Sequence, residues 1–158
     1  MNEREIRVRA ELRALVEEYA MITDALDYEA WVNLFIPDGE FSPTNAGEDE
    51  PFVVWTGERL QDVLHNNDQW KRTFHLIGNH RVTFDDPEHP KGVTYCLAHH
   101  LYRDQPKAYV MLMRYFDDYI ETDDGWRFAA RRPEMVWNQI VDVDATPLSI
   151  AESGQVEL

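Results

Sequence analysis

Hydrophobic residues recur at intervals of three and four near the start of the chain. This stripe consists of Leu12, Leu15, Val16, Tyr19, Ile22 and Leu26. The spacing predicts one amphipathic helix, because these positions share a face of a 3.6-residue repeat. A second, shorter helix is expected over residues 28–35, with Trp31, Leu34 and Phe35 on one side. The turn residues Pro37-Asp38-Gly39 are expected to end it.

The second half of the chain has the pattern of long strands. Turn residues at 85–87, 104–106 and 122–125 separate four candidates, which span 72–84, 92–103, 107–122 and 126–143. Consecutive strands with short connections predict an antiparallel meander. Before it come a short strand at 40–42, a loop at 43–55 and a short helix with Leu60, Val63 and Leu64 on one face. The order predicts an α+β domain, in which helices pack on one face of a curved sheet around a pocket.

Composition narrows the class of protein. The 158 residues are 44% hydrophobic, which suits one domain over 1–143 with a loose or partner-docked tail at 144–158. Thirty acids against 15 bases give a net charge of −15, which argues against nucleic acids and anionic membranes as partners. A single cysteine, Cys96, excludes an internal disulfide and suits a reducing cytoplasm. No signal peptide and no bilayer-spanning apolar run are expected.

Two residues suggest a reaction, Asp27 at the junction of the predicted helices and His75 at the start of the meander. A carboxylate that orients an imidazole makes a general base able to work near neutral pH. Each residue also has a structural alternative. Asp27 precedes the second predicted helix and would serve as its N-cap, while a single ring hydrogen bond would satisfy His75 inside a mixed apolar strand.

Other polar residues on the meander are weaker candidates. His99 and His100 are adjacent on a strand, so at most one of them faces the cavity, and His100 is favoured. One of Arg131 and Arg132 should face inward, where it would bind an anionic oxygen or pair with an acid. Met113 and Tyr115 alternate with outward residues and suit a ligand cavity or an ordinary core equally well. The histidine spacings do not match a metal site.

Three parts of the chain carry a resemblance to a known family. They are the segment Tyr19–Phe41, the run Arg72-Thr73-Phe74-His75-Leu76-Ile77-Gly78 and the later run Asp124-Gly125-Trp126-Arg127-Phe128. With the element order, they resemble the SnoaL-like group of the NTF2-like superfamily, which includes scytalone dehydratase and a hexachlorocyclohexane dehydrochlorinase. The resemblance covers roughly residues 10–140 and implies a cone-shaped fold around a cavity. The residue before the acid is Leu26 rather than a tyrosine, so scytalone dehydration itself is not implied.

The resemblance implies a cofactor-independent lyase or isomerase, of dehydratase or cyclase type. Asp27 and His75 would form the general base, and His100 or a tyrosine would protonate the leaving group. The substrate would be small, largely apolar and cyclic or aromatic-like, with Tyr19, Met113, Tyr115 and Arg131 as its contacts. No cofactor or metal is expected. By analogy with the family, the chain would form a homodimer or homotrimer.

Two non-catalytic functions stay open. The chain also resembles the small β subunit of aromatic-ring dioxygenases in length and in the run Trp31-x-x-Leu34-Phe35. In that role it would be a structural partner of an iron-containing α subunit. Alternatively, the same cavity would serve a plain small-ligand-binding module. Contact between the acid and His75 separates the enzyme from the binding module.

Overall fold

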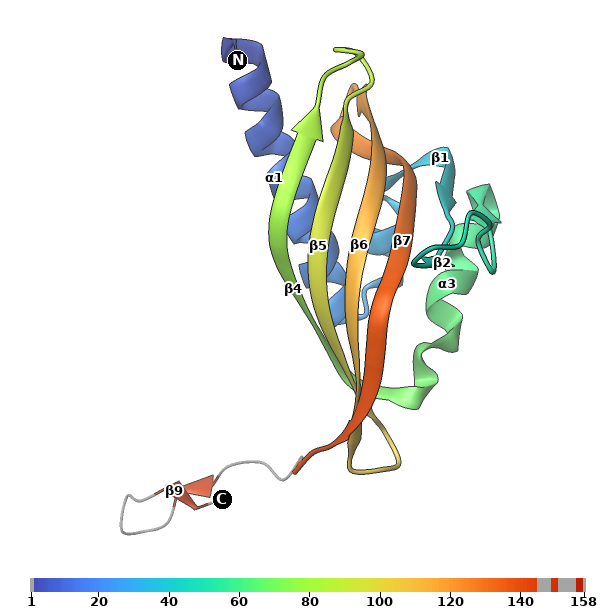
Figure 1. Ribbon diagram of the computed structural model, residues 1–158, viewed down its shortest axis with the longest axis vertical. Helices are drawn as coiled ribbons and strands as arrows, with labels where there is room; N and C mark the ends of the chain where they lie inside the picture. The colour runs from blue at the N-terminus through green and yellow to red at the C-terminus, as the bar shows by residue number, and fades with distance from the viewer. Residues whose placement is uncertain (1, 145–148, 151–155, 158) are drawn as a thin grey trace.

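One long helix and four long strands make up most of the fold (Figure 1). The computed structural model describes residues 2–144, 149–150 and 156–157. The helices are α1 (Glu3–Ala25), α2 (Tyr28–Val32) and α3 (Asp62–His65), and 3₁₀ turns at Gly57–Gln61 and Asn66–Gln69 flank α3. In the part of the chain that the structure describes, none of these helices has the length and apolar character needed to cross a membrane.

The long strands pair in sequence order into a strongly curved sheet. They are β4 (Trp70–Thr83), β5 (Lys91–Tyr102), β6 (Lys107–Thr122) and β7 (Gly125–Asp142), and every neighbouring pair is antiparallel. The short strands are β1 (Phe35–Phe41), β2 (Thr44–Asn45) and β3 (Trp55–Thr56), and the sheet order is β3-β1-β7-β6-β5-β4 with β2 also on β7. The predicted meander and α+β class are confirmed.

Helix α1 lies across one face of the meander (Figure 1). It begins with a capping box, in which Asn2 accepts from the Glu5 amide and the Glu5 carboxylate accepts from the Asn2 amide. Leu12, Leu15, Val16 and Tyr19 of the predicted stripe are buried, with Leu12 and Val16 fully inaccessible, while Ile22 and Leu26 are half-buried. The helix ends at Ala25, because Leu26 adopts a left-handed conformation with φ of 57°.

An aromatic cluster fills the space between α1, α2, β1 and β7. Trp31, the one buried side chain of α2, has its ring centroid 4.9 Å from Phe35 and 5.5 Å from Phe41. Phe128 on β7 packs on the Phe35 ring at 5.3 Å. These rings hold α2 and β1 against β7.

The structure differs from the sequence prediction in this region. Helix α2 ends at Val32 rather than Phe35, and Pro37-Asp38-Gly39 lie within β1 rather than after a helix. Phe35 and Phe41 pair with β7 in parallel, with a register shift between Phe35 and Glu40 that accommodates these turn residues. The sheet is therefore mixed. The expectation of a loose or docked tail falls mostly on residues 145–148, 151–155 and 158, which lie outside the described residues. The described pieces form β8 (Ser149–Ile150) and β9 (Val156–Glu157), which pair with each other.

Candidate active site

The imidazole of His75 forms a short hydrogen bond with a carboxylate of α1. His75 Nδ1 lies 2.7 Å from Asp24 Oδ1, and the same carboxylate accepts hydrogen bonds from the Thr73 hydroxyl at 2.8 Å and the His75 amide at 2.9 Å. Burial alone would raise the pKa of Asp24, but these hydrogen bonds and the nearby His75 lower it below its ordinary value. Asp24 is therefore ionised, and His75 must donate from Nδ1 because a carboxylate only accepts.

Asp27 does not contact His75, which corrects the pairing predicted from the sequence. Its Oδ1 accepts a hydrogen bond from the Ala30 amide at 3.0 Å, so Asp27 is the N-cap of α2. This is the structural alternative considered above, and it has a clear cause. The left-handed Leu26 turns the chain after α1, which leaves Asp24 beside β4 and places Asp27 at the start of the next helix.

His100 on β5 extends the pair into a chain of three groups. His100 Nε2 lies 3.3 Å from His75 Nε2, and one of the two nitrogens must donate. In neutral His75 the proton is on Nδ1, so His100 donates from Nε2 and its Nδ1 carries a lone pair. Among the described residues this buried Nδ1 has no hydrogen-bond partner. Burial, followed by the neighbouring His75, lowers the pKa of His100 to about 3, so this imidazole is neutral near pH 7.

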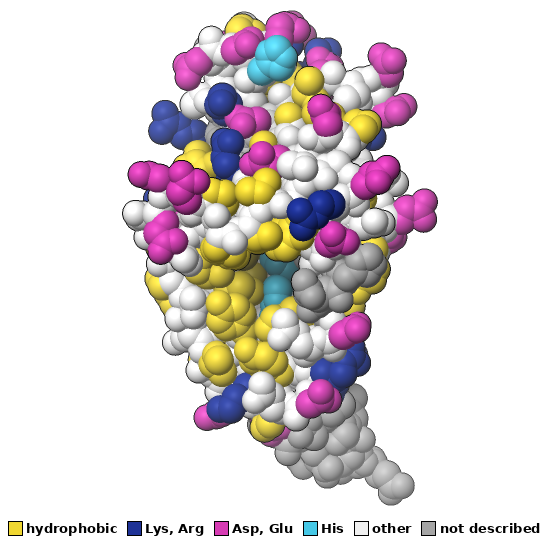
Figure 2. All heavy atoms as spheres, turned by 90° about the vertical axis from the view of Figure 1, so that its right-hand side faces the viewer, with side chains coloured by type: hydrophobic (Ala, Val, Ile, Leu, Met, Phe, Trp, Pro, Cys, Tyr) yellow, Lys and Arg dark blue, Asp and Glu magenta, His cyan; other side chains and the backbone are white. Residues whose placement is uncertain are grey.

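His75 and His100 line a small apolar cavity between the helices and the inner face of the sheet. The cavity has a volume of about 170 Å³. Figure 2 shows histidine side chains at the bottom of a hollow whose walls are hydrophobic. Apart from the histidines, the lining residues are Tyr19, Thr23, Trp31, Phe41, Pro43, Thr44, Phe52, Val63, Met111, Met113, Tyr115, Pro133 and Met135.

Three of the four predicted substrate contacts line this cavity, namely Tyr19, Met113 and Tyr115. Burial raises the pKa of Tyr19 to about 12, so its hydroxyl stays protonated and can donate. The fourth, Arg131, faces inward as strand alternation predicts but does not line the cavity. Its guanidinium lies 3.9 Å from the Tyr19 ring and 4.0 Å from the Tyr115 ring, and it pairs with Asp117 at 3.2 Å. The ion-pair alternative for Arg131 is therefore the one observed.

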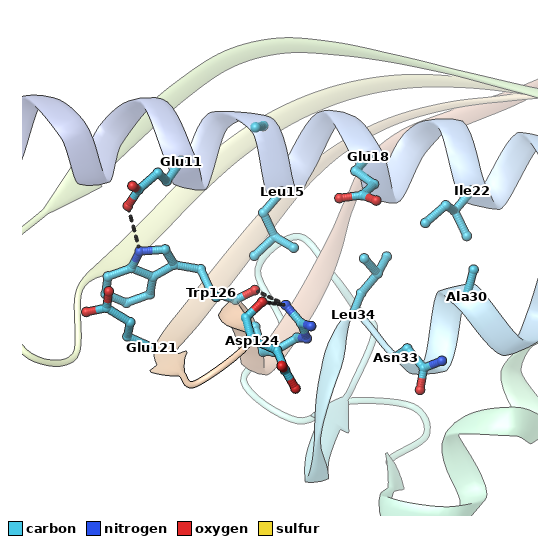
Figure 3. A pocket seen from close by; sticks show the side chains of 13 residues that line it. Glu11, Leu15, Glu18, Ile22, Ala30, Asn33, Leu34, Glu121, Asp124 and Trp126 are labelled. Atoms are coloured by element: carbon cyan, nitrogen blue, oxygen red, sulfur yellow. Dashed lines mark hydrogen bonds between the residues drawn. The ribbon is translucent and has the colours of Figure 1, made fainter.

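A second, larger hollow has no such base among the described residues that line it. It has a volume of about 710 Å³ and lies between α1, α2 and the β6–β7 turn (Figure 3). Its lining includes Glu11, Glu18, Glu121 and Asp124, and the Glu11 carboxylate accepts from the Trp126 indole at 3.0 Å. The described lining of this hollow has carboxylates but no histidine, so it has no imidazole that a carboxylate could orient as a general base.

Histidines outside the cavity have other surroundings. His99 is exposed on the opposite face of β5, and His89 pairs with Asp86 at the surface. His80 lies 3.2 Å from the Tyr119 hydroxyl, and burial, with nearby arginines, lowers its pKa to about 4. Among the described residues, no group of three or more His, Cys, Asp or Glu side chains is arranged to hold a metal ion.

Comparison with known proteins places the chain in a family. The model of the SnoaL-like domain matches residues 4–132. The chain belongs to the SnoaL-like family. A search of curated proteins found no significant match.

Solved structures share the fold of this SnoaL-like protein at low sequence identity. A putative scytalone dehydratase from Novosphingobium aromaticivorans is 20% identical with a TM-score of 0.78, over 92% of this chain and 94% of that one. A hexachlorocyclohexane dehydrochlorinase from Novosphingobium barchaimii is 17% identical with a TM-score of 0.77, over 91% and 98%. A putative aromatic ring hydroxylase from N. aromaticivorans is 19% identical with a TM-score of 0.75, over 87% and 94%.

Sequence reasoning missed Asp24 and the cavity residues Phe52 and Met135 in this SnoaL-like domain. Asp24 lies one position after the buried Thr23, at the edge of the apolar stripe of α1, and this position is the only local signal that it faces the sheet. Phe52 lies in a loop that has no periodic pattern. Met135 lies beside an irregularity in the pairing of β6 with β7, which disturbs simple alternation.

Proposed function

We propose that this SnoaL-like protein is a cofactor-independent lyase or isomerase with His75 as its general base. The observation that carries the proposal is the 2.7 Å contact of Asp24 with His75 at the wall of an apolar cavity. An ionised carboxylate behind Nδ1 fixes the tautomer and stabilises the imidazolium that forms when Nε2 takes a proton. This role replaces the one first assigned to Asp27.

The reaction begins at a C–H bond next to a carbonyl or to a carbon that bears a leaving group. His75 Nε2 takes the proton, and the electron pair of the C–H bond forms a new double bond. In an elimination the leaving group departs with its bonding pair, and in an isomerisation the proton returns to another carbon. Such general base catalysis contributes roughly 10²–10⁴ in rate.

His100 is better suited to positioning than to acid catalysis. An imidazole whose pKa is lowered to about 3 carries no extra proton to give near neutral pH. In the resting cavity the His100 Nε2–H donates a hydrogen bond to His75 Nε2. The substrate C–H must replace this donor before His75 can take its proton. Tyr19, whose hydroxyl is protonated, is the better donor to a substrate oxygen, because this residue lines the same cavity.

The lining limits the substrate to a small and mostly apolar molecule. The cavity of about 170 Å³ is smaller than the roughly 300–1,000 Å³ typical of sites for drug-sized ligands. Three methionines, Met111, Met113 and Met135, supply flexible apolar contacts. We infer a substrate of one or two rings with a single carbonyl or leaving group. The names dehydratase and dehydrochlorinase on structures of the same fold support an elimination.

Deuterium exchange into a simple ketone tests the base without the natural substrate. The probe is 1-indanone in D₂O, with loss of its C2 protons followed by NMR. Wild type is expected to accelerate exchange above buffer, and His75→Gln to remove the acceleration. His99→Gln is the matched control, because His99 is the exposed neighbour of His100 and lies outside the cavity. Equal exchange by wild type and His75→Gln, with both folded by circular dichroism, would contradict the proposal.

The dioxygenase-subunit alternative retains one supporting observation. The putative aromatic ring hydroxylase shares this fold with a TM-score of 0.75. This alternative predicts co-purification with a larger iron–sulfur protein. A ketone exchange activity that depends on His75 in the isolated chain would favour the enzyme.

A further inference from the structure

The indole N–H of Trp31 is a buried donor at the wall of the candidate active site. Trp31 lines the cavity that holds His75, and only 1% of its surface is exposed. Its Nε1 has no hydrogen-bond partner among the residues that the structure describes. A buried tryptophan usually finds an acceptor for this group, and a buried donor left unpaired costs about 1–3 kcal/mol. A ligand oxygen in the cavity would supply the acceptor.

Three other donors of the cavity wall already have acceptors. The Thr23 hydroxyl donates to the Tyr19 carbonyl oxygen at 2.6 Å. His75 donates from Nδ1 to its carboxylate partner, and His100 donates from Nε2 to His75. The other nitrogen of His100 carries a lone pair, so it accepts and cannot hold an anionic oxygen. Trp31 differs from these residues because its donor is used by no described residue.

The Tyr19 hydroxyl is a second donor close to Trp31. The centroids of the two rings are 5.8 Å apart, and both residues line the cavity. Burial raises the pKa of Tyr19 to about 12, and Arg131 and the Trp31 indole oppose this rise only in part. An N–H that favours the phenolate lies on the oxygen side of the ring. The two donors are therefore directed to the same region of the cavity.

The surroundings of Trp31 hold its indole in one orientation. Its ring packs against Phe35 at 4.9 Å and against Phe41 at 5.5 Å. The short helix α2 that carries it is capped by Asp27. Donors that are fixed before a reaction need no reorganisation when negative charge develops beside them. A fixed N–H beside a cavity that holds a candidate base is therefore suited to an oxyanion.

We propose that the Trp31 indole N–H, together with the Tyr19 hydroxyl, binds the carbonyl oxygen of the substrate and stabilises its enolate. This inference rests on the function proposed above and narrows the substrate to a carbonyl compound with a neighbouring C–H bond. His75 Nε2 takes the proton, the C–H electron pair forms the C=C bond, and the C=O π pair moves onto oxygen. When the C=O bond re-forms, the C=C pair either takes a proton at carbon or expels a leaving group with its bonding pair.

Indole N–H signals in a proton–nitrogen NMR spectrum test this contact without turnover. The chain has five tryptophans, and the indole signal that is lost in Trp31→Phe belongs to Trp31. Titration with 1-indanone is expected to move this signal downfield, because its N–H gains an acceptor. Indane has the same rings without the oxygen and should not cause this shift. The Trp126 signal is the internal control, because its N–H already donates to Glu11 at 3.0 Å outside the cavity.

Deuterium exchange of 1-indanone measures what the donor contributes to the rate. Trp31→Phe keeps an aromatic ring and removes the N–H, and it is expected to lower the exchange rate by roughly 10²–10³. Trp126→Phe is the matched control and should keep the wild-type rate. Circular dichroism checks that each variant folds. If Trp31→Phe does not fold, the Trp31 signal is assigned from the four other Trp→Phe variants, and the titration of wild type decides.

Each result supports or overturns the proposal. A downfield shift of the Trp31 signal with 1-indanone but not with indane supports it, as does slower exchange in Trp31→Phe alone. An unchanged Trp31 signal at the highest soluble ketone concentration, or equal shifts with both compounds, overturns it. Wild-type exchange in a folded Trp31→Phe overturns it as well. The function proposed above fails on a different result, namely exchange that does not depend on His75, whatever the Trp31 signal does.

Discussion

Replacing Asp24 and Asp27 in turn by Asn separates the carboxylate that supports His75 from the one that caps a helix. Asp24 accepts three hydrogen bonds of 2.7, 2.8 and 2.9 Å, two of them from His75. An Asn side chain is neutral and has one acceptor oxygen in place of two. Asp24→Asn therefore loses the charge behind Nδ1 and leaves at least one donor without its acceptor.

The expected magnitudes differ widely for the two positions. Loss of a working general base lowers the rate by roughly 10²–10⁴, which corresponds to about 3–5 kcal/mol of transition-state stabilisation. Asp24→Asn is expected to fall in this range. Asp27→Asn should leave both the rate and the stability close to wild type, because Asn caps a helix about as well as Asp. Asp27→Ala should lower the free energy of unfolding by about 0.5–2 kcal/mol with an unchanged rate.

Exchange of 1-indanone protons gives the rate, and urea unfolding gives the stability of the same samples. Asp24→Asn must remain folded under the assay conditions for its rate to be interpreted. The reasoning is refuted if Asp27→Asn loses as much exchange activity as Asp24→Asn. It is also refuted if Asp24→Asn keeps the wild-type rate.

Three further predictions concern His100, the Arg131–Asp117 ion pair and the cavity residue Phe52. Burial lowers the pKa of His100 to about 3 from an ordinary value of 6.5, so the unfolded chain binds more protons between these values. The free energy of unfolding should therefore fall as the pH drops below about 6.5, by up to about 1.4 kcal/mol per unit from this residue. His100→Gln should flatten that slope in urea titrations, and an equal slope in the variant would contradict it. Arg131→Met leaves the buried carboxylate of Asp117 unpaired and should cost about 3–5 kcal/mol in thermal or urea unfolding. Adding Asp117→Leu should recover part of the loss, whereas a larger loss would speak against the ion pair as its cause. Phe52→Ala should weaken the binding of 1-indanone, measured by NMR titration, because Phe52 lines the cavity. Phe74→Ala should leave this binding unchanged, because Phe74 has a similar exposed fraction but lies on the outer face of the sheet. Equal weakening by both variants would show that the effect does not come from the cavity.

The long helix and the long strands could be predicted, because an element that is buried on one face repeats its apolar residues at a fixed interval along the sequence. The three-and-four spacing from Leu12 to Ile22 gave α1, and the turn residues between the strands gave the meander. Alternation indicated that at most one of His99 and His100 faces the cavity, and in the structure His100 lines it while His99 is exposed. The start of β1 could not be read in the same way. Pro37-Asp38-Gly39 have the composition of a turn, and only parallel pairing with β7 draws them into a strand.

The partner of His75 depends on one backbone conformation that the sequence does not mark. Asp24 and Asp27 are three residues apart, so on a continuous helix they would lie on neighbouring parts of one face. Either carboxylate would then satisfy the pattern of an acid near the end of α1 that faces β4. The left-handed φ of 57° at Leu26 ends the helix between them, and such a position usually holds Gly or Asn. Because Leu gives no such signal, the pattern extends the helix through Leu26. The favoured N-cap at Asp27 was the remaining sequence evidence that the chain changes direction before it.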